Sequence, residues 1–152
     1  MNQSPSKYIM IALMLAGMGV ATSVRADNFP DIRGKWFGSY KVAFPAGHPT
    51  LADAAVDTVM ELDVYKQEDN LIWITNKWRR ADSETWITEY GTGSFDLDER
   101  DELVISEEGP SEIEGVNTGT FIGEFDDGNL YLNYLGPLDG VSFSVELKRS
   151  NN

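Results

Sequence analysis

The sequence predicts an all-β protein, an eight-stranded antiparallel up-and-down β-barrel. Eight short stretches of alternating apolar and polar residues follow one another from Gly34 to Arg149. No helix is expected between them that could cover an open sheet. Closure into a barrel removes the two exposed edges that such a sheet would have. Turn signals such as Asp127-Gly128 separate successive stretches, as up-and-down connections require.

The alternation also predicts which side chains point into the barrel, because successive residues of a strand face opposite sides. The expected strands are residues 34–44, 58–67, 71–80, 86–95, 102–107, 118–126, 129–135 and 141–149. The inward sets are Met60, Leu62 and Val64 in the second strand, Ile72, Ile74, Asn76 and Trp78 in the third, Trp86, Thr88 and Tyr90 in the fourth, and Val141, Phe143, Val145 and Leu147 in the last.

One hairpin allows the register to be predicted as well. Asp127-Gly128 is typical of a two-residue type I′ turn, in which both central residues have positive φ. This turn places Phe125 opposite Leu130, Gly123 opposite Leu132 and Phe121 opposite Tyr134. Turn chemistry accounts for the acidic residues here and in residues 96–107, so neither a metal site nor a cofactor is expected.

The first 26 residues resemble an export signal. Lys7 precedes an apolar stretch at residues 8–21, and Val24-Arg25-Ala26 supplies the small residues of a cleavage site. The stretch is shorter than the roughly 20 residues that span a bilayer. We therefore expect cleavage before Asp27, a single barrel domain at residues 27–152, and a periplasmic or secreted location in a bacterial-type envelope. No later stretch suggests contact with a membrane.

Composition excludes several kinds of site. The chain has no cysteine, so disulfides, thiolate metal sites and a cysteine nucleophile are absent. Its formal net charge is −13. Such a charge opposes binding to the phosphates of nucleic acids or to anionic lipid. Its simplest role is solubility, and the alternative is a cationic partner or cation-rich surroundings.

The connections differ in length between the two ends of the expected barrel. Compact acidic turns follow the second, fourth and sixth strands, whereas residues 45–57 and 108–117 form long connections at the other end. Binding residues concentrate on loops held by a rigid scaffold, so a site would open at the long-loop end. The only histidine, His48, lies at this expected mouth. It is either a solvated loop residue or an acid or base acting on a bound ligand.

The motif Gly34-Lys35-Trp36 at the first strand, eight successive strands and a basic residue near the end of the last strand resemble the calycin superfamily of avidins and lipocalins. The length of the chain and the lack of a C-terminal helix are more similar to avidins. Arg149 has the same parity as Val145 and Leu147, so it can lie over the indole of Trp36 as a structural plug at the short-turn end.

The preferred function is noncatalytic binding of a small, mainly apolar molecule inside the barrel. The expected ligand-binding wall consists of inward aromatic and amide groups, namely Tyr40, Asn76, Trp78, Tyr90 and Tyr134. Alternatively these residues only fill the core, and an outer face made of Tyr65, Trp73, Ile122, Tyr131 and Leu135 forms a protein interface, for example in a homo-oligomer. A third alternative, a small isomerase-like enzyme, rests on fold alone. No catalytic constellation is recognisable, so an enzyme is not expected.

Overall fold

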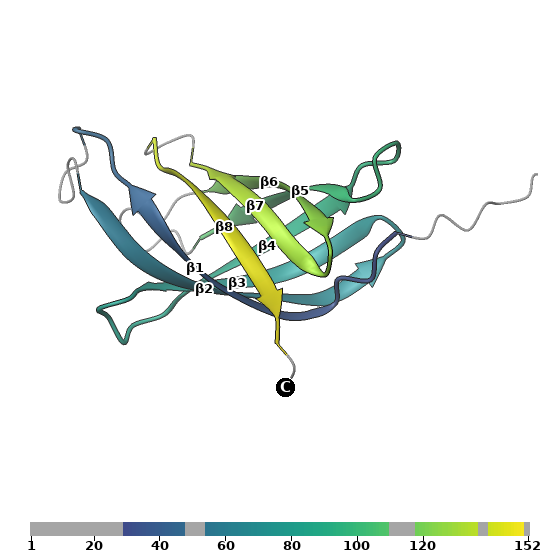
Figure 1. Cartoon of the computed structure of the whole chain (residues 1–152), viewed down its shortest axis with the longest axis horizontal. Helices are drawn as coiled ribbons and strands as arrows, with labels where there is room; N and C mark the ends of the chain where they lie inside the picture. The colour runs from purple at the N-terminus through teal and green to yellow at the C-terminus, as the bar shows by residue number, and fades with distance from the viewer. Residues whose placement is uncertain (1–28, 48–53, 110–117, 137–139, 151–152) are drawn as a thin grey trace, which may run out of the picture.

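Eight antiparallel strands form a closed barrel in which every strand pairs with its sequence neighbours and the last pairs with the first (Figure 1). This computed structural model describes residues 29–47, 54–109, 118–136 and 140–150. The strands are β1 (Gly34–Ala43), β2 (Ala55–Glu68), β3 (Leu71–Arg80), β4 (Ile87–Phe95), β5 (Glu102–Glu108), β6 (Gly119–Asp126), β7 (Asn129–Leu135) and β8 (Ser142–Arg149). The predicted all-β, up-and-down barrel is confirmed.

The β6–β7 hairpin has the predicted turn and register. Asp127 and Gly128 have φ values of 45° and 80°, as a type I′ turn requires. Phe121 pairs with Tyr134, and Gly123 pairs with Leu132. A Cβ atom at Gly123 would meet the carbonyl oxygen of Tyr131 and the side chain of Leu132. The glycine is therefore needed for the close approach of β7 rather than for a special φ.

An apolar core fills the half of the barrel near the short turns. The inward sets predicted for β2, β3 and β8 are confirmed, with Trp78 and Phe143 only partly buried. Members of this core from six strands are Trp36, Leu62, Ile74, Phe121, Leu132 and Leu147. Alternation puts these side chains on one face of each strand, and closure of the sheet brings the faces together.

The short-turn end is closed by the predicted plug and by the segment that precedes β1. Trp36 is fully buried and donates a hydrogen bond from Nε1 to the Ile32 carbonyl oxygen at 2.8 Å. The Arg149 guanidinium lies 4.7 Å from the Trp36 ring centroid, and its Nη2 donates to the Asp31 carbonyl oxygen at 2.6 Å. Gln67 of β2 adds a hydrogen bond from Nε2 to the Pro30 carbonyl oxygen at 2.9 Å. The plug is confirmed and is larger than the sequence indicated.

The inward set predicted for the fourth strand is wrong. Tyr90 is 65% exposed and Trp86 is 44% exposed, and Thr88 shares their outward parity. The alternate residues Ile87, Glu89 and Phe95 point inward instead. Two features account for this orientation. Phe95 enters the core and stacks on Phe29. The small polar side chains of Thr92 and Ser94 point outward, towards solvent.

Several expectations concern parts of the chain outside the described residues. These include the export signal, His48 and most of the two long connections. The described part of the chain contains no helix long and apolar enough to cross a membrane.

Candidate functional site

Three polar side chains meet inside the barrel in the half away from the short turns. Asn76 of β3, Glu89 of β4 and Glu107 of β5 are only 2%, 3% and 3% exposed. Asn76 Nδ2 donates to Glu107 Oε2 at 2.9 Å and to Glu89 Oε2 at 3.2 Å. The two carboxyl groups are also hydrogen-bonded to each other. We call Asn76, Glu89 and Glu107 the polar wall.

Local structure explains how the three side chains reach one another. Asn76 pairs directly with Glu89 across the β3–β4 ladder. Glu107 pairs with Gly91 across the β4–β5 ladder, one inward position along from Glu89. A Cβ at Gly91 would lie 3.2 Å from Glu107 Cα and from Ile74 Cδ1. Because Gly91 has no side chain, the longer Glu107 side chain can extend past it towards Asn76.

Burial gives the two carboxyl groups unusual acidity. Desolvation raises the pKa of Glu89, although hydrogen bonds with Glu107, Trp78 and Asn76 partly lower it. Desolvation and the charge of Glu89 together hold the pKa of Glu107 well above its ordinary value. A direct hydrogen bond between two carboxyl groups requires that one of them be protonated. The raised pKa values therefore keep at least one proton on the pair, and the two carboxyl groups do not both ionise.

Asn76 has an unused hydrogen-bonding atom in this cluster. Its Nδ2 supplies both glutamates, whereas its buried Oδ1 has no hydrogen-bond partner among the described residues. An unsatisfied buried polar atom costs about 1–3 kcal/mol. The polar wall can therefore accept a further hydrogen bond at Oδ1, which requires a donor.

Aromatic rings form the wall on the other side of the barrel interior. Phe143 of β8 stacks on Tyr40 of β1 at 3.9 Å between centroids and on Tyr134 of β7 at 4.8 Å. In a closed barrel of eight strands, β7, β8 and β1 lie across the interior from β3, β4 and β5 (Figure 1). We call Tyr40, Phe143 and Tyr134 the aromatic wall.

The two walls are close enough to interact electrostatically. Burial raises the pKa of Tyr40 well above its ordinary value, and the charges of Glu107 and Glu89 raise it further. Tyr40 therefore stays a neutral phenol. Tyr40, Trp78 and Phe143 face inward but remain partly exposed. This half of the interior is accordingly less completely covered than the apolar half.

Most of the predicted ligand-binding residues come together in this region. Tyr40, Asn76, Trp78 and Tyr134 all face the interior here, whereas Tyr90 lies on the outer surface. Sequence reasoning missed Glu89 and Glu107. Alternation from Phe95 back through the glycines at positions 93 and 91 would have placed Glu89 inside the barrel. Alternation from Leu103 through position 105 would likewise have placed Glu107 inside.

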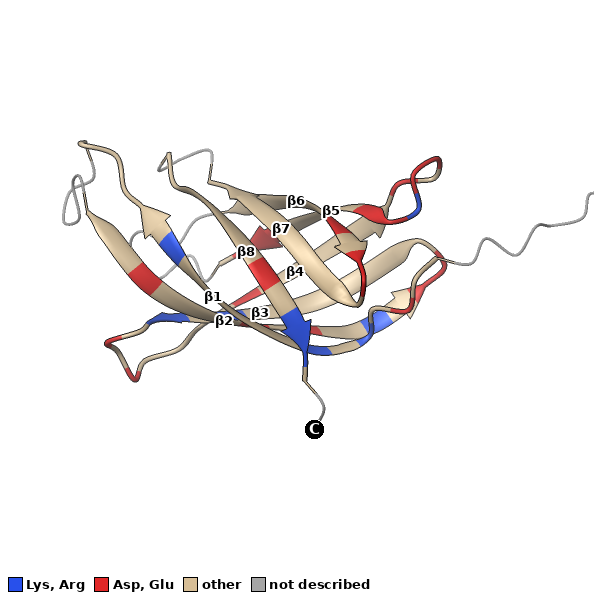
Figure 2. Ribbon diagram, viewed as in Figure 1, with Lys and Arg blue, Asp and Glu red and all other residues tan. Residues whose placement is uncertain are grey.

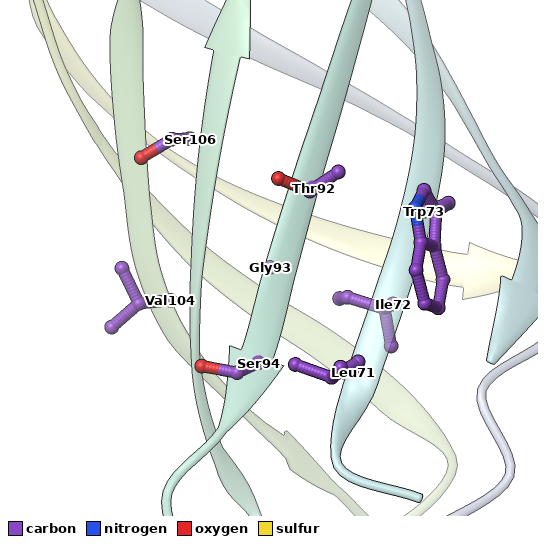
Figure 3. Close-up of a pocket in the computed structure, with 8 residues that line it drawn as sticks. All are labelled: Leu71, Ile72, Trp73, Thr92, Gly93, Ser94, Val104 and Ser106. Atoms are coloured by element: carbon purple, nitrogen blue, oxygen red, sulfur yellow. The ribbon is translucent and has the colours of Figure 1, made fainter. Parts of the chain in front are cut away.

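A separate groove lies on the outer surface across β3, β4 and β5. It has a volume of about 450 Å³, and Figure 3 shows the residues that line it, namely Leu71, Ile72, Trp73, Thr92, Gly93, Ser94, Val104 and Ser106. A smaller hollow of about 340 Å³ shares Ser94 and Val104 with it and reaches Ile122. The groove exists because small outward side chains on β4 lie between larger ones on β3 and β5.

Eight outward residues of this region are uncharged, although the Lys66 ammonium of β2 lies over the Trp73 ring at 4.1 Å, at the edge of the region. Two neighbouring rows of outward residues cross β3 to β6 in register. One row is Leu71, Ser94, Val104 and Ile122, and the other is Trp73, Thr92, Ser106 and Thr120. Acidic residues gather instead at the compact turns of one end (Figure 2). We call these eight residues the uncharged face.

The residues predicted to form an outer interface do lie outside. Tyr65, Ile122 and Leu135 are exposed, while Trp73 and Tyr131 are half-buried. Tyr65 lies at an irregularity of the β2–β3 ladder between Val64 and Lys66. Trp73 and Ile122 belong to the uncharged face, and Leu135 pairs with Thr120 at its edge.

Comparisons of this chain with protein-family models, with curated proteins and with solved structures found no match. The geometry of the barrel is therefore the basis for any functional assignment.

Proposed function

We propose that this protein is a noncatalytic binding protein that holds a small, mainly apolar ligand inside the barrel, between the aromatic wall and the polar wall. The observation that carries the proposal is the stack of Tyr40, Phe143 and Tyr134 facing buried polar groups across the interior. Aromatic surfaces with a few fixed polar groups are typical of small-molecule sites. The plug at the other end supports entry from the long-loop end.

The spacing of the two glutamates favours binding over hydrolysis. Carboxyl pairs that hydrolyse glycosides stand about 5 Å or more apart, so that a sugar or water fits between them. Glu89 and Glu107 are instead hydrogen-bonded to each other. The layout of eight strands with Trp36 beneath Arg149 further supports a calycin-type protein.

Tryptophan fluorescence tests the position of the site. A screen by thermal shift and by native mass spectrometry of protein from its own host would first identify a ligand, because a bound ligand stabilises the folded state. Ligand titration should then change the emission of Trp78, which faces inward, but not that of the outward Trp73. The Trp78→Phe variant should lose the signal and the matched Trp73→Phe variant should keep it. Loss of the signal in Trp73→Phe alone would place the ligand on the outer groove.

The uncharged face supports a second candidate, association of two copies of this chain. A net charge of −13 makes copies repel each other unless the contact avoids acidic residues. The uncharged face offers such a contact, with Val104 and Ile122 about half exposed at its centre. Light scattering should detect a dimer that Val104→Lys dissociates and that Ser39→Lys, on the outer face of β1, leaves intact. A monomer at every concentration would rule this candidate out.

A further inference from the structure

Among the described residues, the interior contains two acidic side chains and no basic side chain. The only ionisable carboxyl groups buried in this part of the chain are those of Glu89 and Glu107. Every described lysine and arginine is at least partly exposed. When one of the two carboxyl groups ionises, no buried lysine or arginine among the described residues balances its charge. Burying an unpaired charge is strongly unfavourable, so a positive group at this point would stabilise the folded protein.

The polar wall has almost no free hydrogen-bond donor, so it can mainly accept further hydrogen bonds. Asn76 has used both N–H groups on the glutamates, and its Oδ1 has no partner among the described residues. A glutamate that ionises offers only acceptor oxygens. A ligand that fits must therefore donate several hydrogen bonds from one small group. An ammonium group has three N–H donors and a positive charge.

The aromatic wall suits the rest of such a ligand. Phe143 is stacked on both Tyr40 and Tyr134, so the aromatic wall presents mainly ring edges, against which an apolar body can pack. Trp78 of β3 adds an inward indole close to Glu89, whose pKa it helps to lower. A neutral polar group would not balance an ionised carboxylate, and an anion would be repelled by it.

We infer that the ligand of this barrel is a protonated amine with an apolar body, and that its ammonium group binds to Asn76 Oδ1, Glu89 and Glu107. This inference rests on the proposed function. The apolar body lies against the aromatic wall, and the ammonium group supplies the positive charge that the polar wall lacks.

Binding also releases a proton from the two glutamates. One ammonium balances one ionised carboxylate, so a pair that carries two protons loses one of them to solvent as the ammonium enters, and the site stays neutral overall. The groups facing the pair from the neighbouring strands are Thr58 of β2, Asn76 and Trp78 of β3, Tyr40 of β1, Gly119 and Phe121 of β6, Tyr134 of β7 and Phe143 of β8. The pKa of Tyr40 is raised, so its phenol stays neutral between pH 5 and 8 and adds no charge to the site. Affinity should therefore increase as the pH rises over this range, until the amine itself loses its proton.

Isothermal titration calorimetry with three matched probes tests the inference. The probes are 2-phenylethylamine, the neutral 2-phenylethanol and the anionic 3-phenylpropanoate, each titrated at pH 5.5 and 7.5. We expect the amine to bind at least about tenfold more tightly than the alcohol, since hydrogen bonds to charged groups are the stronger ones. The anion should not bind. Titrations in two buffers of different ionisation enthalpy should show proton release with the amine only.

Two variants distinguish an effect of the polar wall from a general effect of removing one acidic side chain. Glu107→Gln should weaken amine binding by at least about tenfold and should weaken alcohol binding by much less, because the alcohol carries no positive charge. Glu108→Gln removes the same charge from the neighbouring exposed position and should change neither. If Glu107→Gln does not fold, as judged by thermal unfolding, Glu89→Gln serves the same purpose.

The outcomes distinguish this inference from the proposed function. If neutral apolar compounds bind as tightly as the amine, or if Glu107→Gln leaves amine binding unchanged, the amine inference is wrong but the proposed function stands. If neither the amine nor a panel of neutral apolar compounds binds or shifts the thermal unfolding, both are wrong.

Discussion

Trp36 connects three parts of the short-turn end. Its ring lies edge-on to Phe125 at 6.0 Å between centroids, beneath the Arg149 guanidinium, and its Nε1 is bonded to Ile32. Trp36→Ala should lower the free energy of unfolding by about 3–5 kcal/mol, since it removes a large buried side chain and leaves a cavity. Urea denaturation measures this loss.

A matched control for Trp36 lies next to it in β1. Lys35 is exposed and forms a surface ion pair with Glu61 at 3.0 Å. Such pairs contribute about 0–1 kcal/mol, so Lys35→Ala should change stability little. If Trp36→Ala also lost less than about 1 kcal/mol, the proposed role of Trp36 in the plug would be wrong.

Glu107 should make the stability of the protein depend on pH. The pKa of Glu107 and that of Glu89 are raised in the folded protein above 4.5, the value of an ordinary glutamate. The folded state therefore binds more protons than the unfolded state above pH 4.5. The stability contributed by the pair is fully present below that pH and falls as the pH rises through the raised pKa values.

Glu107→Gln should remove most of this fall, because glutamine has no titrating proton. Urea denaturation between pH 5 and 8 should show the variant gaining stability relative to the wild type as the pH rises. Glu108→Gln, at the neighbouring exposed position, should follow the wild type. Parallel pH curves for Glu107→Gln and wild type would contradict the shared proton.

At the scale of the strand, close packing of β6 on β7 depends on Gly123. An added Cβ would meet the backbone of Tyr131, which cannot rotate away as a side chain could. Gly123→Ala should therefore destabilise the protein by about 1–3 kcal/mol, as overpacking does. Gly47 has no atom within 4 Å of such a Cβ, so Gly47→Ala should be nearly neutral. Equal thermal unfolding temperatures for the two variants would contradict this account of β6.

Strand β4 illustrates where alternation alone misleads. The two possible inward sets were Trp86, Thr88 and Tyr90, or the residues between them, which include Glu89. Average hydrophobicity favours the aromatic set. The barrel adopts the other because Phe95 joins the core and the inward glycines of β4 allow Ile74 and Ile105 to approach closely. These contacts come from neighbouring strands, which single-strand periodicity does not include.

At the scale of the whole molecule, the excess of acidic residues should make stability depend on salt. The charges repel one another in the compact state, and salt shortens the Debye length from about 30 Å at 0.01 M to about 8 Å at 0.15 M. The thermal unfolding temperature at pH 7 should therefore rise when NaCl is added over this range.

A control for the salt effect uses acid. At pH 4 many carboxylates are protonated, so the same addition of NaCl should raise the unfolding temperature less than at pH 7. An unfolding temperature that does not change with salt at pH 7 would mean that the acidic residues are too well dispersed to repel one another.

The sequence by itself determined the barrel, the faces of β2, β3 and β8, the β6–β7 turn and the contact of Trp36 with Arg149. These features follow from local signals, namely alternation with period two and the backbone preference of Asp127-Gly128, together with the antiparallel pairing of first and last strands. Only the tertiary structure decided that Asn76, Glu89 and Glu107 meet and are buried together in the polar wall. Asn76 and Glu107 are 31 positions apart, and the burial that keeps a proton on the glutamates arises only when strands from around the barrel close over them.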